Sequence, residues 1–244
     1  MNKPYHRIWR PLKNGQKAEY LDDELYASTH YQASNSYNLI ENDLKKIFEF
    51  IEPVDENLNI FSHRIYELFL RSCTEYESHC KDILLDNGLK GSFNNEKYFL
   101  INIMCKLSEY SAMLLLDGNI YLNINPFKDW ANVDYEPLKW YQDYNSVKHN
   151  RNSEFSKANL SNLINSVCAV QILLIAQFHK NALYFNNKNQ PIFEVVDENL
   201  ISFDSSIFFI KLPVWNENEK YDFNWNMICN SNDRISKYFE INEN

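Results

Sequence analysis

The sequence predicts a mainly α-helical protein with a small β-rich C-terminal appendage. Only 4 Gly and 7 Pro occur among 244 residues, and tight hairpins usually need Gly at positive φ, so a many-turned β-sandwich is disfavoured. Four principal segments repeat apolar residues at the helical period, whereas the runs after Asn186 are short, β-branched and aromatic. The chain is therefore divided into an N-terminal arm (1–34), a helical bundle (35–186) and a β-rich extension (187–244).

The first two helices of the bundle follow from apolar spacing and stop signals. Apolar side chains at the 3.6-residue period predict a helix over 36–51, which Pro53 ends. The same period predicts a longer helix over 60–86, and Gly88 supplies its stop. A short helix over 21–30 is expected in the arm that precedes them.

The rest of the bundle is predicted by the same signals. A third helix is expected over 95–116 with Gly118 as its terminator, followed by a long loop. A short helix over 138–149 then leads into a helix of about 28 residues, for which Asn152 or Ser153 can act as N-cap.

The tail has a different character. The runs PIFEVV, SSIFFIKLP and YDFNW are separated by Asn, Asp, Ser and Pro, which is typical of strands. Because an isolated pair of strands is marginally stable in water, these strands are expected to form a small sheet or hairpin packed on the helices.

Composition limits the classes of function and location. A formal net charge of -9 disfavours non-specific nucleic-acid binding through the whole surface, although a local basic groove remains compatible with it. No apolar run reaches about 18 residues and no secretory signal opens the chain, so a cytoplasmic protein without a membrane span is expected. The five cysteines form no CxxC pair and are interpreted as reduced core residues: Cys73, Cys80, Cys105, Cys168 and Cys229.

The segment from residue 145 to residue 151 holds the strongest candidate site. Asn145, Lys148, His149 and Arg151 lie within seven positions, directly ahead of a long apolar helix. Lys148 and Arg151 supply donors suited to phosphate, and the N-terminus of the following helix is expected to add N–H groups. The alternative is structural: Lys148 and Arg151 would cap the short helix, and His149 would be a surface histidine.

A second candidate constellation lies on the helix over 60–86. Charged residues recur every four positions from His63 to His79. Arg64, Arg71 and Glu75 fall within about 40° of one another on the flank of the buried stripe, where they can reach a cleft between helices. The alternative is a solvated face of i,i+4 ion pairs. No third ligand falls at metal spacing and no Walker, Rossmann or GxSxG motif occurs, so no metal or cofactor is expected.

Three stretches of the predicted bundle belong together: RIYELFLRSCTEYE (64–77), LKWYQDYNSVKHNR (138–151) and FSKANLSNLINSVCAV (155–170). In combination they resemble a bacterial branch of the HEPN group, the nucleotide-binding domains of higher eukaryotes and prokaryotes. The resemblance covers about residues 36–183 and rests mainly on YN-x-x-KH-x-R followed by F-x-x-A-N-L. It implies a HEPN-like bundle of four or five helices that often dimerises. Many members are metal-independent RNases of toxin-antitoxin or antiviral defence systems, and others bind nucleotides without cutting.

The resemblance also implies roles for individual residues. His149 would act as general base on a ribose 2′-hydroxyl or as acid on the leaving 5′-oxygen, while Arg151 and Lys148 stabilise charge on the phosphate. Asn145 would orient the ribose or base, and a symmetric homodimer would supply a second histidine.

The usual HEPN pattern places an arginine four to six residues before the histidine. This chain departs from that pattern, because Asn145 precedes His149 and Arg151 follows it. Arg71 or Arg64 would replace the missing arginine from the neighbouring helix, with Glu75 positioning the cluster. His149 is therefore expected within one side-chain length of Arg71 or Glu75, in the chain or across a dimer interface.

Three classes of function stay open at this point. The first is a HEPN-like endoribonuclease with RNA as substrate, and the second is a non-catalytic nucleotide or RNA binder. The third is a helical protein-interaction module without a small-molecule site. A homodimer, and an antitoxin or defence-system partner, are expected for the first class, and none of the three needs a membrane.

Overall fold

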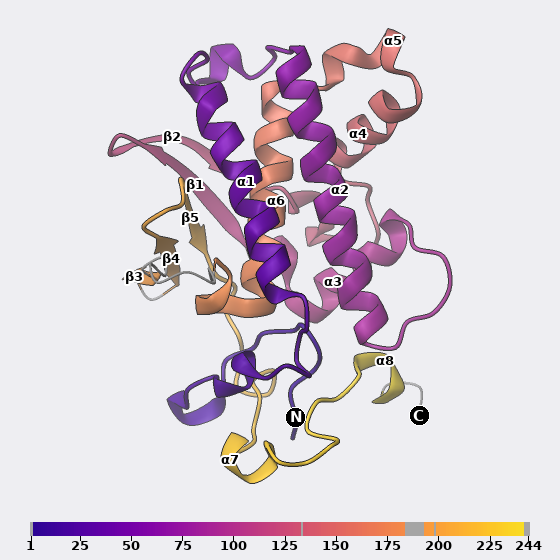
Figure 1. Cartoon of the computed structure of the whole chain (residues 1–244), viewed down its shortest axis with the longest axis vertical. Helices are drawn as coiled ribbons and strands as arrows, with labels where there is room; N and C mark the ends of the chain where they lie inside the picture. The colour runs from indigo at the N-terminus through magenta and orange to yellow at the C-terminus, as the bar shows by residue number, and fades with distance from the viewer. Residues whose placement is uncertain (1, 133, 184–192, 198, 242–244) are drawn as a thin grey trace.

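A computed structural model describes residues 2–132, 134–183, 193–197 and 199–241 of the chain. A layer of helices packs beside a five-stranded antiparallel sheet of order β2-β1-β5-β4-β3 (Figure 1). The described helices are α1 (His30–Phe48), α2 (His63–Asp86), α3 (Asn95–Cys105), α4 (Lys139–His149), α5 (Arg151–Glu154), α6 (Leu160–Phe178), α7 (Trp225–Ile228) and α8 (Tyr238–Ile241). The strands are β1 (Ser111–Leu116), β2 (Asn119–Ile124), β3 (Phe193–Asp197), β4 (Leu200–Phe203) and β5 (Phe208–Lys211).

The predicted fold class, a mainly helical bundle with a small β-rich appendage, is wrong. The structure is an α/β mixture with a sizeable sheet: of the described residues, 52% are helical and 13% lie in strands and bridges. The sheet is not confined to the tail, because β1 in the middle of the chain pairs with β5 through Ala112↔Ile210 and Met113↔Phe209. It therefore joins strands from both sides of residue 186. The run YDFNW, expected as a strand, makes one bridge from Tyr221 to Leu12 and then enters α7.

The strands β1 and β2, which were not predicted, lie where a long third helix and a loop were expected. Helix α3 ends at Cys105 because Lys106 adopts a left-handed conformation with φ 57°. The hairpin β1–β2 follows, with Leu116 opposite Asn119, so that Asp117 and Gly118 form a two-residue turn. Both turn residues have positive φ, 49° and 80°, and Asp-Gly is the sequence such hairpins favour. Gly118 thus turns a hairpin and does not end a helix.

Replacing Gly118 by alanine is expected to destabilise the protein by about 1–2 kcal/mol, because alanine pays a steric penalty at positive φ. A Cβ there meets nothing within 4 Å, so backbone strain alone is responsible. Urea unfolding measures the loss. Asp117→Gly in the same turn is the control and should leave stability equal or higher. A Gly118→Ala protein as stable as the wild type would contradict the turn assignment.

Helix α6 forms the centre of the helical layer, packed against α1 and α2 (Figure 1). It is long and apolar enough to cross a membrane, yet 89% of its apolar window is buried inside the structure. That burial is what the core helix of a soluble protein shows. The helix begins at Leu160 with Asn159 as N-cap, so the expected start at Asn152 or Ser153 is wrong.

Glu41 connects α1 to the sheet. It is only 2% exposed, and its Oε1 accepts hydrogen bonds from Ser206 Oγ at 2.7 Å, Ile207 N at 3.0 Å and Tyr37 Oη at 3.1 Å. Burial raises the pKa of the Glu41 carboxyl. Three donors from two parts of the fold therefore converge on one buried carboxyl group.

Four of the five cysteines are confirmed as free, buried residues, and Cys229 is half-buried. Burial raises the pKa of the Cys73 and Cys80 thiols well above the ordinary value. A thiol in such surroundings is a poor nucleophile, because the thiolate is the reactive form. These side chains serve packing.

His179 makes stability depend on pH. It follows α6, stacks on Trp9 at 4.0 Å between ring centroids, and burial lowers its pKa to about 4. In the unfolded chain the histidine has its ordinary pKa near 6.5. Between the two pKa values the unfolded state therefore holds more protons, and stability falls as the pH drops.

Between pH 7 and pH 5 we expect the free energy of unfolding to fall by about 2 kcal/mol because of His179, measured by urea unfolding. His179→Gln should reduce this dependence and the exposed His149→Gln should not; an unchanged dependence in His179→Gln would contradict the assignment.

Candidate functional site

Helix α4 carries the predicted cluster at its C-terminal end. Trp140, Tyr144 and Val147 are buried on one side of it, which leaves Lys148 and His149 exposed. A hydrogen bond of 3.0 Å from Asn162 of α6 to Asp143 fixes the helix on the core. The basic end of α4 is therefore held by a rigid support.

Lys148 is tied to neighbouring side chains. Its Nζ donates to Tyr144 Oη at 3.1 Å and lies 3.9 Å from a carboxylate oxygen of Glu77 on α2. The hydrogen bond with Tyr144 raises the pKa of Lys148, so the ammonium stays charged at neutral pH. Glu77 also accepts a hydrogen bond of 2.8 Å from Tyr141. Lys148 therefore links α4 to α2 and places a positive charge at the C-terminal end of α4.

Arg151 is held by aromatic rings and a histidine. Its guanidinium lies 4.6 Å from the ring centroid of Tyr66 and 5.8 Å from that of Phe155, and one nitrogen lies 3.2 Å from His63 Nδ1. Arginine only donates, so His63 Nδ1 accepts and its Nε2 carries the proton of the neutral ring. Among the described residues, no carboxylate forms an ion pair with Arg151. Its positive charge is left for an external anion.

His149 and Asn145 complete this region. His149 is exposed and lies two residues before Arg151, while Asn145 is half-buried one helical turn earlier on the same face of α4. Within the described part of the chain, neither side chain has a hydrogen-bond partner. We call His63, Lys148, His149 and Arg151 the basic corner. It holds two imidazoles and two cations: Arg151 lies against His63 at the N-terminal end of α2, while the Lys148 ammonium lies beside Glu77 further along that helix.

The arginines of α2 lie elsewhere. Helices α1 and α4 pack on opposite sides of α2 (Figure 1), and Arg71 points to α1, where it donates to Asp43 at 2.6 Å and to the carbonyl of Leu39 at 3.2 Å. Glu75 lies 3.4 Å from the buried His79 on its own helix. Within one chain the predicted composite of His149 with Arg71 or Glu75 is therefore not formed. A composite across a dimer interface stays a prediction.

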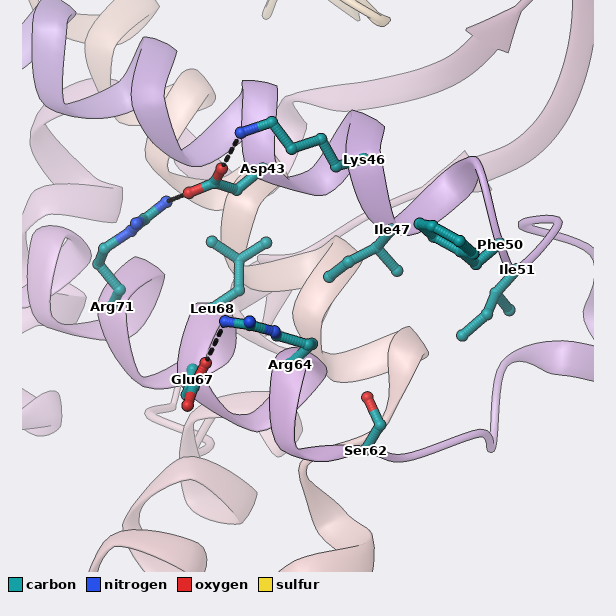
Figure 2. Close-up of a pocket in the computed structure, with 10 residues that line it drawn as sticks. All are labelled: Asp43, Lys46, Ile47, Phe50, Ile51, Ser62, Arg64, Glu67, Leu68 and Arg71. Carbon is teal, nitrogen blue, oxygen red and sulfur yellow. Dashed lines mark hydrogen bonds and ion pairs between the residues drawn. The ribbon is translucent and has the colours of Figure 1, made fainter.

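Arg64 and Arg71 instead line a cavity of about 690 Å³ between α1 and α2 (Figure 2). Asp43 lies between Arg71 and Lys46 there, and Arg64 pairs with Glu67 at 3.2 Å. This flank is ion-paired, but not through the i,i+4 pairs considered from the sequence, because Arg64 pairs with Glu67 at i,i+3 and Arg71 pairs with Asp43 of α1. Each cation that lines the cavity has a carboxylate partner, whereas Arg151 has none among the described residues, so the cavity is less suited to an anion than the surroundings of Arg151.

The expectation that a helix N-terminus would add donors beside Arg151 is wrong. The N–H groups of Leu160 and Ser161 donate to the carbonyls of Ile60 and Leu58, each at 2.9 Å, and that of Asn162 donates to Asn159 Oδ1. The first turn of α6 is therefore already occupied. A phosphate at the corner therefore receives no N–H donors from the start of α6.

No protein-family model, curated protein or solved structure matches this chain. Its function must be inferred from the geometry of the basic corner.

Reasoning from the sequence missed three members of this site. His63 was considered as the first residue of the charged row on the helix over 60–86, and Tyr66 and Phe155 were not considered as site residues. His63 and Arg151 are 88 positions apart, so no local pattern joins them. The sequence held one indication of this contact. The helical spacing of His63, Tyr66 and Glu77 places all three on one face of α2, and Glu77 of this face contacts α4.

Proposed function

We propose that the chain is a HEPN-like, RNA-binding protein of the cytoplasm that cleaves RNA at the basic corner without a metal ion. The observation that supports this best is Arg151, a cation without a carboxylate partner in the described chain, set between aromatic rings and His63. Guanidinium groups in this setting bind phosphate with charge-assisted hydrogen bonds. His149 lies two residues before it in the chain and has no hydrogen-bond partner among the described residues.

The proposed reaction is a transesterification. His149 takes the proton from the ribose 2′-hydroxyl, the 2′-oxygen forms a bond to phosphorus, and the bond from phosphorus to the 5′-oxygen breaks. Once the Arg151 guanidinium binds the phosphate in place of His63 Nδ1, that nitrogen takes up a proton from solvent, and the protonated His63 donates its Nε2 proton to the leaving 5′-oxygen. The products are a 2′,3′-cyclic phosphate and a 5′-hydroxyl, so protons and electron pairs balance.

The other residues stabilise charge and position the substrate. Arg151 compensates the negative charge that grows on the phosphate oxygens, and Lys148 adds to the local potential. Asn145, on the same face of α4 as His149, is placed to orient the ribose or the base. His63 supplies the second imidazole from the same chain, so a dimer is not required for the chemistry. A symmetric homodimer, and an antitoxin or defence-system partner, remain part of the proposal.

The experiment that tests the proposal compares two arginines of equal charge. Wild-type protein, Arg151→Gln and Arg71→Gln are incubated with single-stranded RNA in EDTA. We expect wild-type and Arg71→Gln proteins to cleave, because Arg71 pairs with Asp43 on the opposite side of α2. Arg151→Gln should weaken both binding and turnover, each by about 10-fold or more.

Other outcomes discriminate among the alternatives. RNA binding that depends on Arg151 without any cutting would replace the ribonuclease by a non-catalytic binding module. Absence of both binding and cutting would overturn the proposal and favour the protein-interaction module.

A further inference from the structure

A group of partly exposed aromatic rings surrounds Arg151. Phe155 lies at its centre, with ring centroids of His63 at 4.9 Å, Tyr66 at 5.6 Å and Phe61 at 5.7 Å. Phe61 is 48% exposed and His63 is exposed, while Tyr66 and Phe155 are half-buried. We call these four rings the aromatic platform. It adjoins the basic corner, with which it shares His63.

The backbone beneath the platform is fixed. Phe61 bridges to Asn159, and the carbonyls of Leu58 and Ile60 accept from the first N–H groups of α6. Ser62, the next residue, caps α2 by accepting from Ile65 N at 3.2 Å. Phe61 is therefore held in place by its neighbours although half of its side chain faces solvent. A ring presented in this way loses little conformational freedom when a ligand stacks on it.

We infer that the aromatic platform stacks an unpaired nucleobase of single-stranded RNA while Arg151 binds the adjoining phosphate. This inference deepens the proposed function and rests on it. Aromatic side chains beside cations form the usual arrangement for binding single strands, because every base offers a face to stack and every linkage carries a charge. In a duplex the base faces are covered by their neighbours, so the platform selects single-stranded over double-stranded RNA.

The test uses a binding probe that cannot be cleaved. A fluorescent RNA of about 12 nucleotides with methylated 2′-hydroxyls is titrated with the full chain, alone and annealed to its complement. The single strand should bind at least about 10-fold more tightly than the duplex. Phe61→Leu keeps an apolar side chain but removes the ring, and it should weaken single-strand binding by about 10-fold, while Phe61→Trp should retain binding.

Phe50 provides the matched control, since it is 85% exposed but lines the cavity between α1 and α2 (Figure 2). Phe50→Leu should leave binding unchanged. If Phe61→Leu binds as well as wild type while Arg151→Gln does not, the platform is wrong and the RNA site stands. If neither substitution changes binding, or the wild type binds no RNA, both the platform and the proposed function are wrong.

Discussion

Replacing His149 by alanine should lower the rate of RNA cleavage by about 10²- to 10⁴-fold, the range that general acid–base groups contribute. The side chain is exposed and packs into no core, so the protein should unfold at the wild-type temperature. RNA binding should fall little, because the phosphate is bound by Arg151. Single-turnover cleavage in EDTA together with a separate binding titration measures both effects.

The control for this substitution is Asn152→Ala, at an exposed neighbouring position of α5. It should cleave at the wild-type rate. Equal rates in His149→Ala and wild type would remove His149 from the mechanism, whereas loss of binding in His149→Ala would assign it to phosphate recognition.

Replacing Glu41 by alanine should cost about 3 kcal/mol or more, the largest stability effect we expect. The change leaves Ser206 Oγ and Ile207 N without their acceptor, while Tyr37 Oη keeps Gln171 Oε1 at 3.1 Å, and each unsatisfied donor costs about 1–3 kcal/mol. For a chain of this size the melting temperature should fall by roughly 6–12 °C.

Glu41→Gln is the matched control, since its amide oxygen can still accept from these donors. It should lose much less stability than the alanine variant. Thermal unfolding followed by circular dichroism compares the two. A loss below about 1 kcal/mol in Glu41→Ala would show that the contact between α1 and the sheet is not stabilised by this carboxyl group.

Helices with local signals were predictable from the sequence. Apolar period, Pro53 and Gly88 indicated the helices observed as α1 and α2 to within several residues at their starts. The hairpin β1–β2 was missed because its apolar run fits a buried helix as well as a strand, and the Asp-Gly pair was interpreted as a helix stop. Its pairing with β5 joins residues about 100 positions apart, which no local period reports.

The candidate site was likewise predictable from the sequence only in part. The residues of α4 and α5 could be grouped from sequence because they are neighbours along the chain. The side of α2 that faces them could not, because the sequence does not show whether Arg71 turns toward Asp43 or toward α4. In the structure Arg71 binds Asp43 of α1. The face of α2 that carries His63 and Tyr66 is the one that lies against Arg151.

The chemical nature of the RNA ends tests the central claim most directly. RNA incubated with wild-type protein in EDTA should yield fragments with 2′,3′-cyclic phosphate and 5′-hydroxyl ends, identified by mass spectrometry. A single 2′-deoxy substitution at the cleaved nucleotide should block cleavage there, because the attacking oxygen is absent. Fragments with 3′-hydroxyl and 5′-phosphate ends, or RNA that stays intact in EDTA, would contradict a ribonuclease based on His149 and Arg151.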